Sequence, residues 1–364
     1  MLFRSGLGTY QVTQHGGERW SAARGYLLPH LGQRPNLDVR TRTRVLRILF
    51  EGRRAVGAEV LQRGERRILR ARREVLLSAG ALQSPQLLML SGIGPAAELA
   101  RHGIPVLHDA PEVGRNLQDH TDFIFGHETS SLDALGISFK GTARALRELG
   151  RFRRERRGML TSNFAECGGF LRTRPELEAP DIQIHFVTGL VDDHARRIHL
   201  GHGLSCHVCV LRPRSRGSVT LSGADPLAPP RIDPAFLADP ADLEDMVAGF
   251  KVTRRLLRAP SLAEWLGRDL FTEGVEDDAA ICDALRRRCD TVYHPVGSCR
   301  MGGDAASVVD PQLRVRGVEG LRVIDASVMP ALVGGNTNAP TVMIAEKAVD
   351  LLRGVSRAPG VNPR

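Results

Sequence analysis

The chain has 364 residues, too many for one ordinary hydrophobic core, and its 42% hydrophobic and 25% charged residues are typical of a soluble globular protein. It has no run of about 18 apolar residues and no apolar segment with a cleavage site at the amino terminus, so neither a transmembrane helix nor a secretory signal is predicted. We therefore expect a cytoplasmic protein, with peripheral association with the inner membrane as an alternative.

The positive charge comes almost entirely from arginine. The formal net charge is +9 at a sequence pI near 9.8, which is compatible with a nucleic-acid or membrane surface. The arginines are spread along the whole chain, no nucleic-acid motif occurs, and aromatic residues make up only 5%. We therefore predict no nucleic-acid partner.

Six cysteines raise the question of a metal or a disulfide. Cys206 and Cys209 form the only C-x-x-C, inside a strand-like run. Side chains three residues apart on a strand point to opposite faces, so we predict neither a metal nor a disulfide there.

The first half of the chain combines strands with one clear helix start. Residues 36–80 alternate or run apolar between glycines and are predicted to form a strand meander. A helix is predicted to begin at Ser84, with Pro85 in its first turn, and to close at Gly92. Residues 141–157 are strongly basic and predict a solvated helix, because their apolar face is short. A membrane-surface helix is the alternative.

The second half returns to strands before two further helices. Between 160 and 235, alternating apolar runs predict antiparallel strands, and 239–258 is an amphipathic helix that starts with aspartates. At the end, the apolar strand LRVID leads through a glycine-rich loop to a helix with Asn338 as cap candidate and Pro340 in its first turn. The free N–H groups of such a helix suit an anionic partner, although an ordinary capped helix has the same pattern.

One histidine stands in a restricted setting. His294 precedes a proline, which holds its backbone extended, and small residues follow it. A lone histidine is as readily structural as catalytic, so this segment alone leaves both roles open.

Several motifs together resemble one enzyme family. In chain order these are SAGALQSPQLLMLSGIGP, VGRNLQDH, YHPVGSCRMG, VVDPQLRVRGVEGLRVIDASVMP and GGNTNAPTVMIAEKAVDLL. They are similar to the blocks of the glucose-methanol-choline (GMC) oxidoreductases, and GTYQVTQHGGERWSAARGYL resembles the choline-dehydrogenase-like branch. The resemblance runs from about Gly6 to Leu352.

The resemblance implies a mixed α+β and α/β fold with FAD as cofactor. It implies an incomplete FAD-binding domain over 1–125 and 291–352, a substrate-binding domain over 126–290 with an antiparallel sheet backed by helices, and a disordered tail over 353–364. His294 would take the hydroxyl proton of a primary alcohol, and Asn336 would hydrogen-bond the alcohol oxygen. The implied cofactor-binding residues are Val45, Ala79, Gly80, Tyr293, Asp325, Ala326, Thr337 and Asn338.

Other residues are assigned by weighing two roles. His120 is a conceivable second base, but it and Asp119 belong to a block that is structural in the family. Choline as substrate would need a pocket of carboxylates or aromatics, for which Glu166 is only a guess. The electron acceptor would be a quinone-like carrier or oxygen.

One expected element is missing from the sequence. No G-x-G-x-x-G occurs, although the family's amino-terminal βαβ unit carries it and holds the FAD pyrophosphate. We expect a fragment whose missing segment belongs to the complete protein and which binds FAD weakly alone. Two alternatives stay open: a flavin lyase of the hydroxynitrile-lyase type, against which the choline-dehydrogenase-like blocks argue, and a non-catalytic binding remnant.

Overall fold

The computed structural model describes residues 5–354, which form two compact units. Unit 1 comprises residues up to 37 together with 120–214 and 239–292. Unit 2 comprises 38–119, 215–238 and the residues from 293 onward. Apart from Arg353 and Gly354, the tail predicted over 353–364 lies outside the described residues.

The units differ from the predicted domains by two long segments, and by short shifts of the boundaries that place residues 120–125 and 291–292 in unit 1. Residues 5–37, predicted as part of the FAD-binding domain, belong to unit 1, because strand β1 (Gly6–Thr9) hydrogen-bonds antiparallel to β12 (Ala165–Leu171). Residues 215–238, predicted as part of the substrate-binding domain, belong to unit 2, where Leu117 and Gly217 exchange both backbone hydrogen bonds. Backbone pairing between distant segments, which no local pattern encodes, sets both differences.

Unit 1 is built on a seven-stranded antiparallel sheet with the order β1-β12-β13-β14-β10-β17, and β11 pairs with β14. The remaining strands of this sheet are β10 (Thr121–Thr129), β11 (Gly136–Ile137), β13 (Ile182–Val187), β14 (Gly201–Val210) and β17 (Asp290–Thr291). The other elements of the unit are β2 (Gln14–His15), β3 (Glu18–Arg19), η1 (Ala23–Leu27), η2 (Leu28–His30), α3 (Phe139–Glu155), η3 (Met159–Thr161), η4 (Asp193–Ala195), α4 (Pro240–Leu257), η5 (Pro260–Leu262) and α5 (Asp278–Arg288). This confirms the predicted antiparallel sheet backed by helices.

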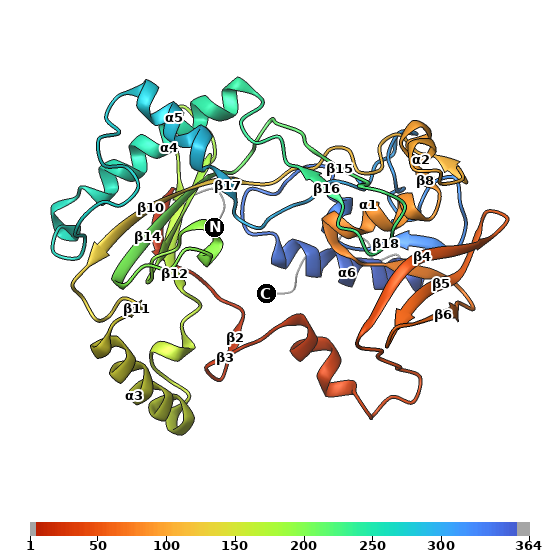
Figure 1. The fold of residues 1–364 in the computed structure, drawn as a ribbon, viewed down its shortest axis with the longest axis horizontal. Coiled ribbons are helices and arrows are strands. Elements are labelled where there is room, and N and C mark those ends of the chain that lie inside the picture. Colours follow the sequence, from red (N-terminus) through yellow and green to blue (C-terminus); the bar gives the residue numbers. More distant parts are fainter. Residues whose placement is uncertain (1–4, 355–364) are drawn as a thin grey trace. The chain divides into compact units, whose positions relative to one another are not determined.

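The two faces of this sheet differ in character. Helices α4 and α5 pack together, α4 against β14 and α5 against β10 (Figure 1). On the helix side, Phe123 and Phe125 stack against Phe250 of α4 with ring centroids 5.1 and 4.7 Å away. The alternation of a strand turns Asp122 and His207 to the opposite face. The same alternation separates Cys206, opposite Phe125, from Cys209, opposite Asp122, as predicted.

Unit 2 combines an antiparallel meander with a short parallel sheet. The meander is β4 (Thr43–Glu51), β5 (Arg54–Gln62) and β6 (Glu65–Arg70), which confirms the predicted strands. Strand β7 (Val75–Leu77) pairs parallel with β18 (Leu321–Val323). The other elements are α1 (Gly80–Leu90), β8 (Ile93–Gly94), α2 (Ala96–Arg101), β9 (His108–Asp109), β15 (Ser218–Thr220), β16 (Arg231–Asp233), η6 (Ala326–Val328) and α6 (Asn338–Leu352).

The predicted start of the first helix of unit 2 is wrong by four residues. Helix α1 begins at Gly80 rather than Ser84, so Pro85 lies inside it. A proline has no N–H for the carbonyl four residues earlier, that of Ala81. The hydroxyl of Ser298 donates to that carbonyl instead. The helix therefore tolerates its proline because a side chain from a distant segment replaces the missing donor.

Candidate active site

Four of the predicted cofactor-binding residues meet where two parallel strands end. Strand β7 leads directly into Ala79 and Gly80, and β18 leads into Asp325 and Ala326. The Gly80 N–H donates to Asp325 Oδ2 at 2.9 Å. Parallel strands present their carboxyl ends at the same edge, so residues about 245 positions apart in the chain converge there.

The Asp325 carboxylate accepts hydrogen bonds from three groups at this edge. It is buried, with 6% of its surface exposed. The Ser84 hydroxyl lies 2.5 Å from Oδ2, and the Ser327 N–H donates to Oδ1 at 2.8 Å. The Ser84 hydroxyl also accepts from the Ala79 N–H. Sequence reasoning missed Ser84 as a site residue, because it treated that position only as a helix start.

The two predicted catalytic side chains lie together. Asn336 Nδ2 is 3.3 Å from His294 Nε2, across 42 residues of sequence. With the amide nitrogen facing the ring, Asn336 donates and His294 Nε2 accepts, which places the ring proton on Nδ1. His294 is 9% exposed, whereas Asn336 is exposed. The imidazole nitrogen that carries the lone pair therefore faces the exposed amide.

Burial controls the charge of this imidazole. Removal from water lowers the pKa of His294 from 6.5 to about 4. With its pKa lowered in this way, the ring is neutral at pH 7 and can accept a proton.

The backbone on either side of the ring is tightly constrained. Tyr293 has φ of 68°, a left-handed conformation that is uncommon for a residue with a side chain, and its own side chain is 63% exposed. The His294 N–H donates to Asp119 Oδ1 at 3.0 Å, and Pro295 follows. The side chain of Asp119, which was predicted to be structural, thus contacts the main chain of the candidate base, His294.

A short segment before Asp119 joins the two loops that carry His294 and Asn336. Gln118 exchanges backbone hydrogen bonds with Val296 on the first loop, at 3.0 and 2.8 Å. Its side chain donates to the Pro330 carbonyl at 3.2 Å and accepts from the Leu332 N–H at 3.1 Å on the second. Asn116 Nδ2 donates to the Gly297 carbonyl. The sequence block VGRNLQDH signalled importance here, but only the structure shows that Gln118 links the loops.

The helix that follows Asn336 begins without a side-chain cap. Thr337 occupies the N-cap position of α6, and no side chain accepts from the first turn, so the predicted cap Asn338 is instead the first helical residue. Pro340 lies in that turn and lacks an N–H. The remaining first-turn N–H groups carry the partial positive charge of the helix end and are available to an anionic group.

Three residues considered from the sequence lie outside the site formed by His294, Asn336 and Asp325. Val45 lies on β4 next to a register shift of the meander, 37% exposed, and no hydrogen bond described for it reaches the residues above. His120 belongs to unit 1, where its Nε2 lies 3.2 Å from the Leu211 carbonyl, in agreement with a structural role. Glu166 is also in unit 1 and lines a cleft of about 240 Å³.

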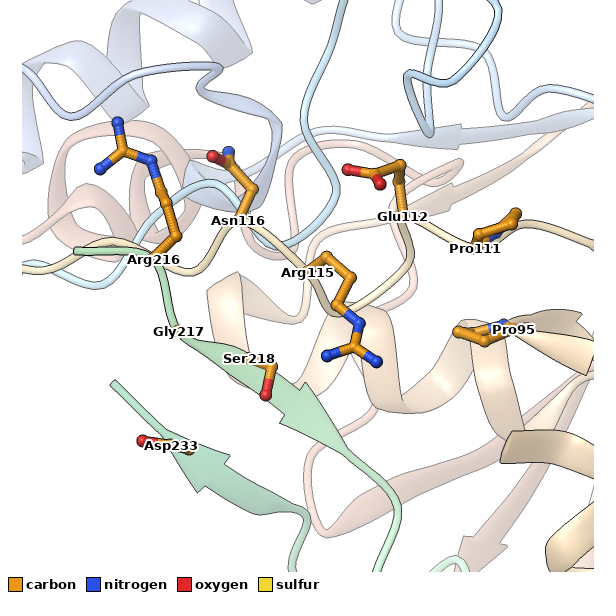
Figure 2. Close-up of a pocket in the computed structure, with 9 residues that line it drawn as sticks. All are labelled: Pro95, Pro111, Glu112, Arg115, Asn116, Arg216, Gly217, Ser218 and Asp233. Atoms are coloured by element: carbon orange, nitrogen blue, oxygen red, sulfur yellow. The ribbon is translucent and has the colours of Figure 1, made fainter. Parts of the chain in front are cut away.

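Unit 2 also contains a cleft of about 630 Å³ (Figure 2). Arg115 extends toward Ser218 of β15, whereas Arg216 points in another direction (Figure 2). Glu112 and Asp233 line the same cleft. The lining of this cleft carries charges of both signs and includes none of the predicted site residues. We therefore assign this cleft no role in the chemistry proposed below.

Residues 5–354 contain neither a candidate metal cluster nor a candidate membrane-spanning helix. This part of the chain contains no cluster of three or more histidine, cysteine or acidic side chains able to hold a metal ion. Among its helices, none combines the length and apolar character needed to cross a membrane.

Comparisons with known proteins agree with this architecture. Residues 4–122 and 213–345 match the amino-terminal and carboxy-terminal models of the GMC oxidoreductases. The chain belongs to the GMC oxidoreductase family. It is 47% identical over 352 residues to an alcohol dehydrogenase [acceptor] of Pseudomonas putida, covering 96% of this chain and 64% of that protein.

A second curated relative and one solved structure are also similar to this chain. Human mitochondrial choline dehydrogenase is 42% identical over 357 residues, covering 96% of this chain and 59% of the relative. A formate oxidase structure from Aspergillus oryzae RIB40 superposes with a TM-score of 0.87 at 28% identity, covering 97% of this chain and 66% of that one. The chain therefore spans about three-fifths of the length of the curated relatives it matches.

Proposed function

We propose that this chain forms part of an FAD-dependent enzyme that oxidises a primary alcohol to an aldehyde, with His294 as the proton acceptor. The observation that carries the proposal is the 3.3 Å approach of the Asn336 amide to Nε2 of a buried, neutral His294. The names of relatives, an alcohol dehydrogenase and choline dehydrogenases, support alcohol as the substrate class.

The residues of the chain fit the ring end of FAD. A Cβ added at Gly80, where φ is +84°, would meet no atom within 4 Å, so a flat group can approach this backbone. The uncapped first turn of α6 offers N–H groups and positive charge to an anion. Ala79, Asp325 and Ala326 adjoin Gly80, and η6 packs against both α1 and α6. Bound there, FAD would supply the hydride acceptor.

The chemistry of the protein side chains follows from their geometry. An alcohol oxygen inserted between the two side chains accepts from Asn336 Nδ2 and donates its proton to His294 Nε2. With FAD bound, the carbinol carbon would give up its hydride to the cofactor, and the alcohol would become an aldehyde. A base with a pKa of about 4 is weak, so the negative charge that develops beside it must raise that pKa during the reaction. Asn336 and the α6 amino end stabilise this charge without moving.

The decisive experiment measures flavin reduction in a protein that carries both this chain and a phosphate-binding glycine motif. His294→Ala is expected to retain FAD but to slow reduction by a primary alcohol ~100-fold or more, because the proton acceptor is lost. His120→Gln serves as the control, since an amide can still donate to the Leu211 carbonyl. A reduction rate for His294→Ala close to that of the wild type excludes His294 as the base.

The same experiment addresses the remaining alternatives. A flavin lyase would cleave a cyanohydrin without reducing its flavin, and a non-catalytic remnant would retain neither FAD nor activity. An oxygen electrode with and without a quinone distinguishes oxygen from a quinone-like acceptor.

A further inference from the structure

Unit 1 exposes a group of large apolar side chains that its own sheet does not cover. Ile137 of β11 pairs with Gly201 and bridges to Leu200, so the two segments lie side by side. The exposed fractions are 51% for Ile137, 93% for Phe139, 74% for Ile198 and 85% for Leu200. We call these four residues the apolar patch. Single exposed apolar residues are ordinary, but a contiguous group marks a contact surface.

Helix α3 continues this patch along its outer side. None of its residues is buried. At 3.6 residues per turn, Leu146, which is 67% exposed, lies on the same side as Phe139. Lys140, Arg147 and Arg154 follow at seven-residue spacing along one flank, and Arg153 continues the line of Phe139 and Leu146 at the same spacing. The outer side of α3 thus has an apolar line that ends in Arg153 and is bordered by one basic flank.

The arginines of α3 divide into two groups by their partners. Arg144 pairs with Asp133, and Arg151 lies within 4 Å of Glu148 and Glu155. Within the described chain, the four basic residues of the outer side form no ion pair: Lys140, Arg147, Arg153 and Arg154. Paired arginines therefore serve the fold, while the outer basic residues leave positive charge uncompensated.

The helix is held firmly beside the patch. Ser138 caps α3 by accepting from the Gly141 N–H at 2.9 Å. The Ser138 hydroxyl also lies 2.8 Å from His202 Nε2 on β14, and His202 Nδ1 lies 2.7 Å from the Ala134 carbonyl. These contacts fix the first turn of α3 to β14, which begins directly after Leu200 and pairs with β11, so α3 is held beside the patch.

We propose that α3 and the apolar patch bind the surface of an anionic phospholipid bilayer. The apolar side chains enter the boundary between headgroups and acyl chains, and the outer basic residues contact the phosphates. This proposal is independent of the proposed enzymatic function.

The charge and the side-chain types of this surface favour a lipid bilayer over a second copy of the chain or a nucleic acid. A second copy packed around a twofold axis would bring the same unpaired arginines against each other. Nucleic acid would contact the arginines, but the aliphatic Ile137, Ile198 and Leu200 offer bases no stacking surface. A bilayer with anionic headgroups matches both the apolar line and the basic flank.

The test is co-sedimentation of the full chain with vesicles. One set contains phosphatidylcholine alone, and the other contains equal parts of phosphatidylcholine and phosphatidylglycerol. The wild-type chain should bind the second set much more tightly, and added salt should weaken binding. Arg147→Glu with Arg154→Glu should weaken it at least about tenfold. Phe139→Ser with Leu200→Ser should also weaken it, and should do so at every salt concentration.

A matched control separates this surface from general positive charge. Arg255→Glu with Arg287→Glu makes the same charge change on exposed positions of α4 and α5 in the same unit, and should leave binding unchanged. Equal loss in this control, or no binding by the wild type, would overturn the proposal. Analytical ultracentrifugation supplies a second check, because a wild-type dimer that Phe139→Ser with Leu200→Ser dissociates would assign the patch to self-association instead.

Discussion

Two buried histidines, one in each unit, differ in what burial does to them. His294 in unit 2 meets an amide, and burial lowers its pKa to about 4. For His207 in unit 1, burial acts in the same direction, but Asp122 Oδ2 lies 2.6 Å from Nδ1, and its charge and hydrogen bond raise the pKa of His207 above its ordinary value. Burial alone thus favours a neutral proton acceptor, whereas the neighbouring Asp122, although burial raises its own pKa, favours the protonated form of His207.

The largest expected effect comes from breaking the carboxylate pair. Asp122→Ala leaves the imidazole of His207 buried without its partner and should reduce the free energy of unfolding by about 3–5 kcal/mol. Urea denaturation measures this loss. Asp122→Asn combined with His207→Gln replaces both charged groups by amides and should cost much less. If this double variant is as unstable as Asp122→Ala, the pair is not what holds the two strands.

The pH dependence of stability should have opposite signs at the two histidines. The folded-state pKa of His294 lies below 6.5, so the unfolded state binds its proton first, and wild-type stability should rise by about 3 kcal/mol relative to His294→Gln between pH 4 and 6.5. Above pH 6.5 this difference should be flat. The folded-state pKa of His207 is raised, so its contribution is present below pH 6.5 and is lost as the pH rises through the folded value.

Urea denaturation at a series of pH values, on wild type, His294→Gln and His207→Gln, measures both differences. The same slope for the two variants would show that the environments of the histidines do not differ as described.

A smaller effect is expected from the segment that links the two active-site loops. Gln118→Leu removes the partner of the Pro330 carbonyl and the Leu332 N–H and should destabilise unit 2 by about 1–3 kcal/mol. Gln86→Leu is the matched control, since buried Gln86 also donates to one carbonyl, that of Ala228. Imidazole NMR titration should show a changed pKa of His294 in the first variant and none in the second. Equal pKa values in both would mean that Gln118 does not position the ring.

The smallest effect is expected at Asp119. Asp119→Asn keeps an oxygen to accept the His294 N–H but removes the charge, so the free energy of unfolding should fall by only about 1 kcal/mol. The pKa of His294 should move little, because burial rather than charge sets it. A large rise or fall of that pKa in the NMR titration would show that the Asp119 charge also controls the base.

The main residues of the candidate site could be predicted from the sequence, but the side chains that surround and position them could not. His294 and Asn336 could be selected because each stands in a distinctive glycine-rich block, and Asp325 because it ends an apolar strand. Their neighbours could not be selected. Ser84 and Gln118 act through bonds to partners 241 and 214 residues away, and nothing in their local sequence specifies those partners.

By itself, the sequence determined the strands, the order of the motifs and the chemical types of the site residues, because hydrophobic periodicity and side-chain identity are local properties. The tertiary structure alone decided the rest. Distant contacts set the true start of α1, through the Ser298 hydroxyl, and drew residues 5–37 into unit 1, through the pairing of β1 with β12. Burial likewise made His294 neutral and left Phe139 uncovered, since the depth of a side chain depends on every segment that packs around it.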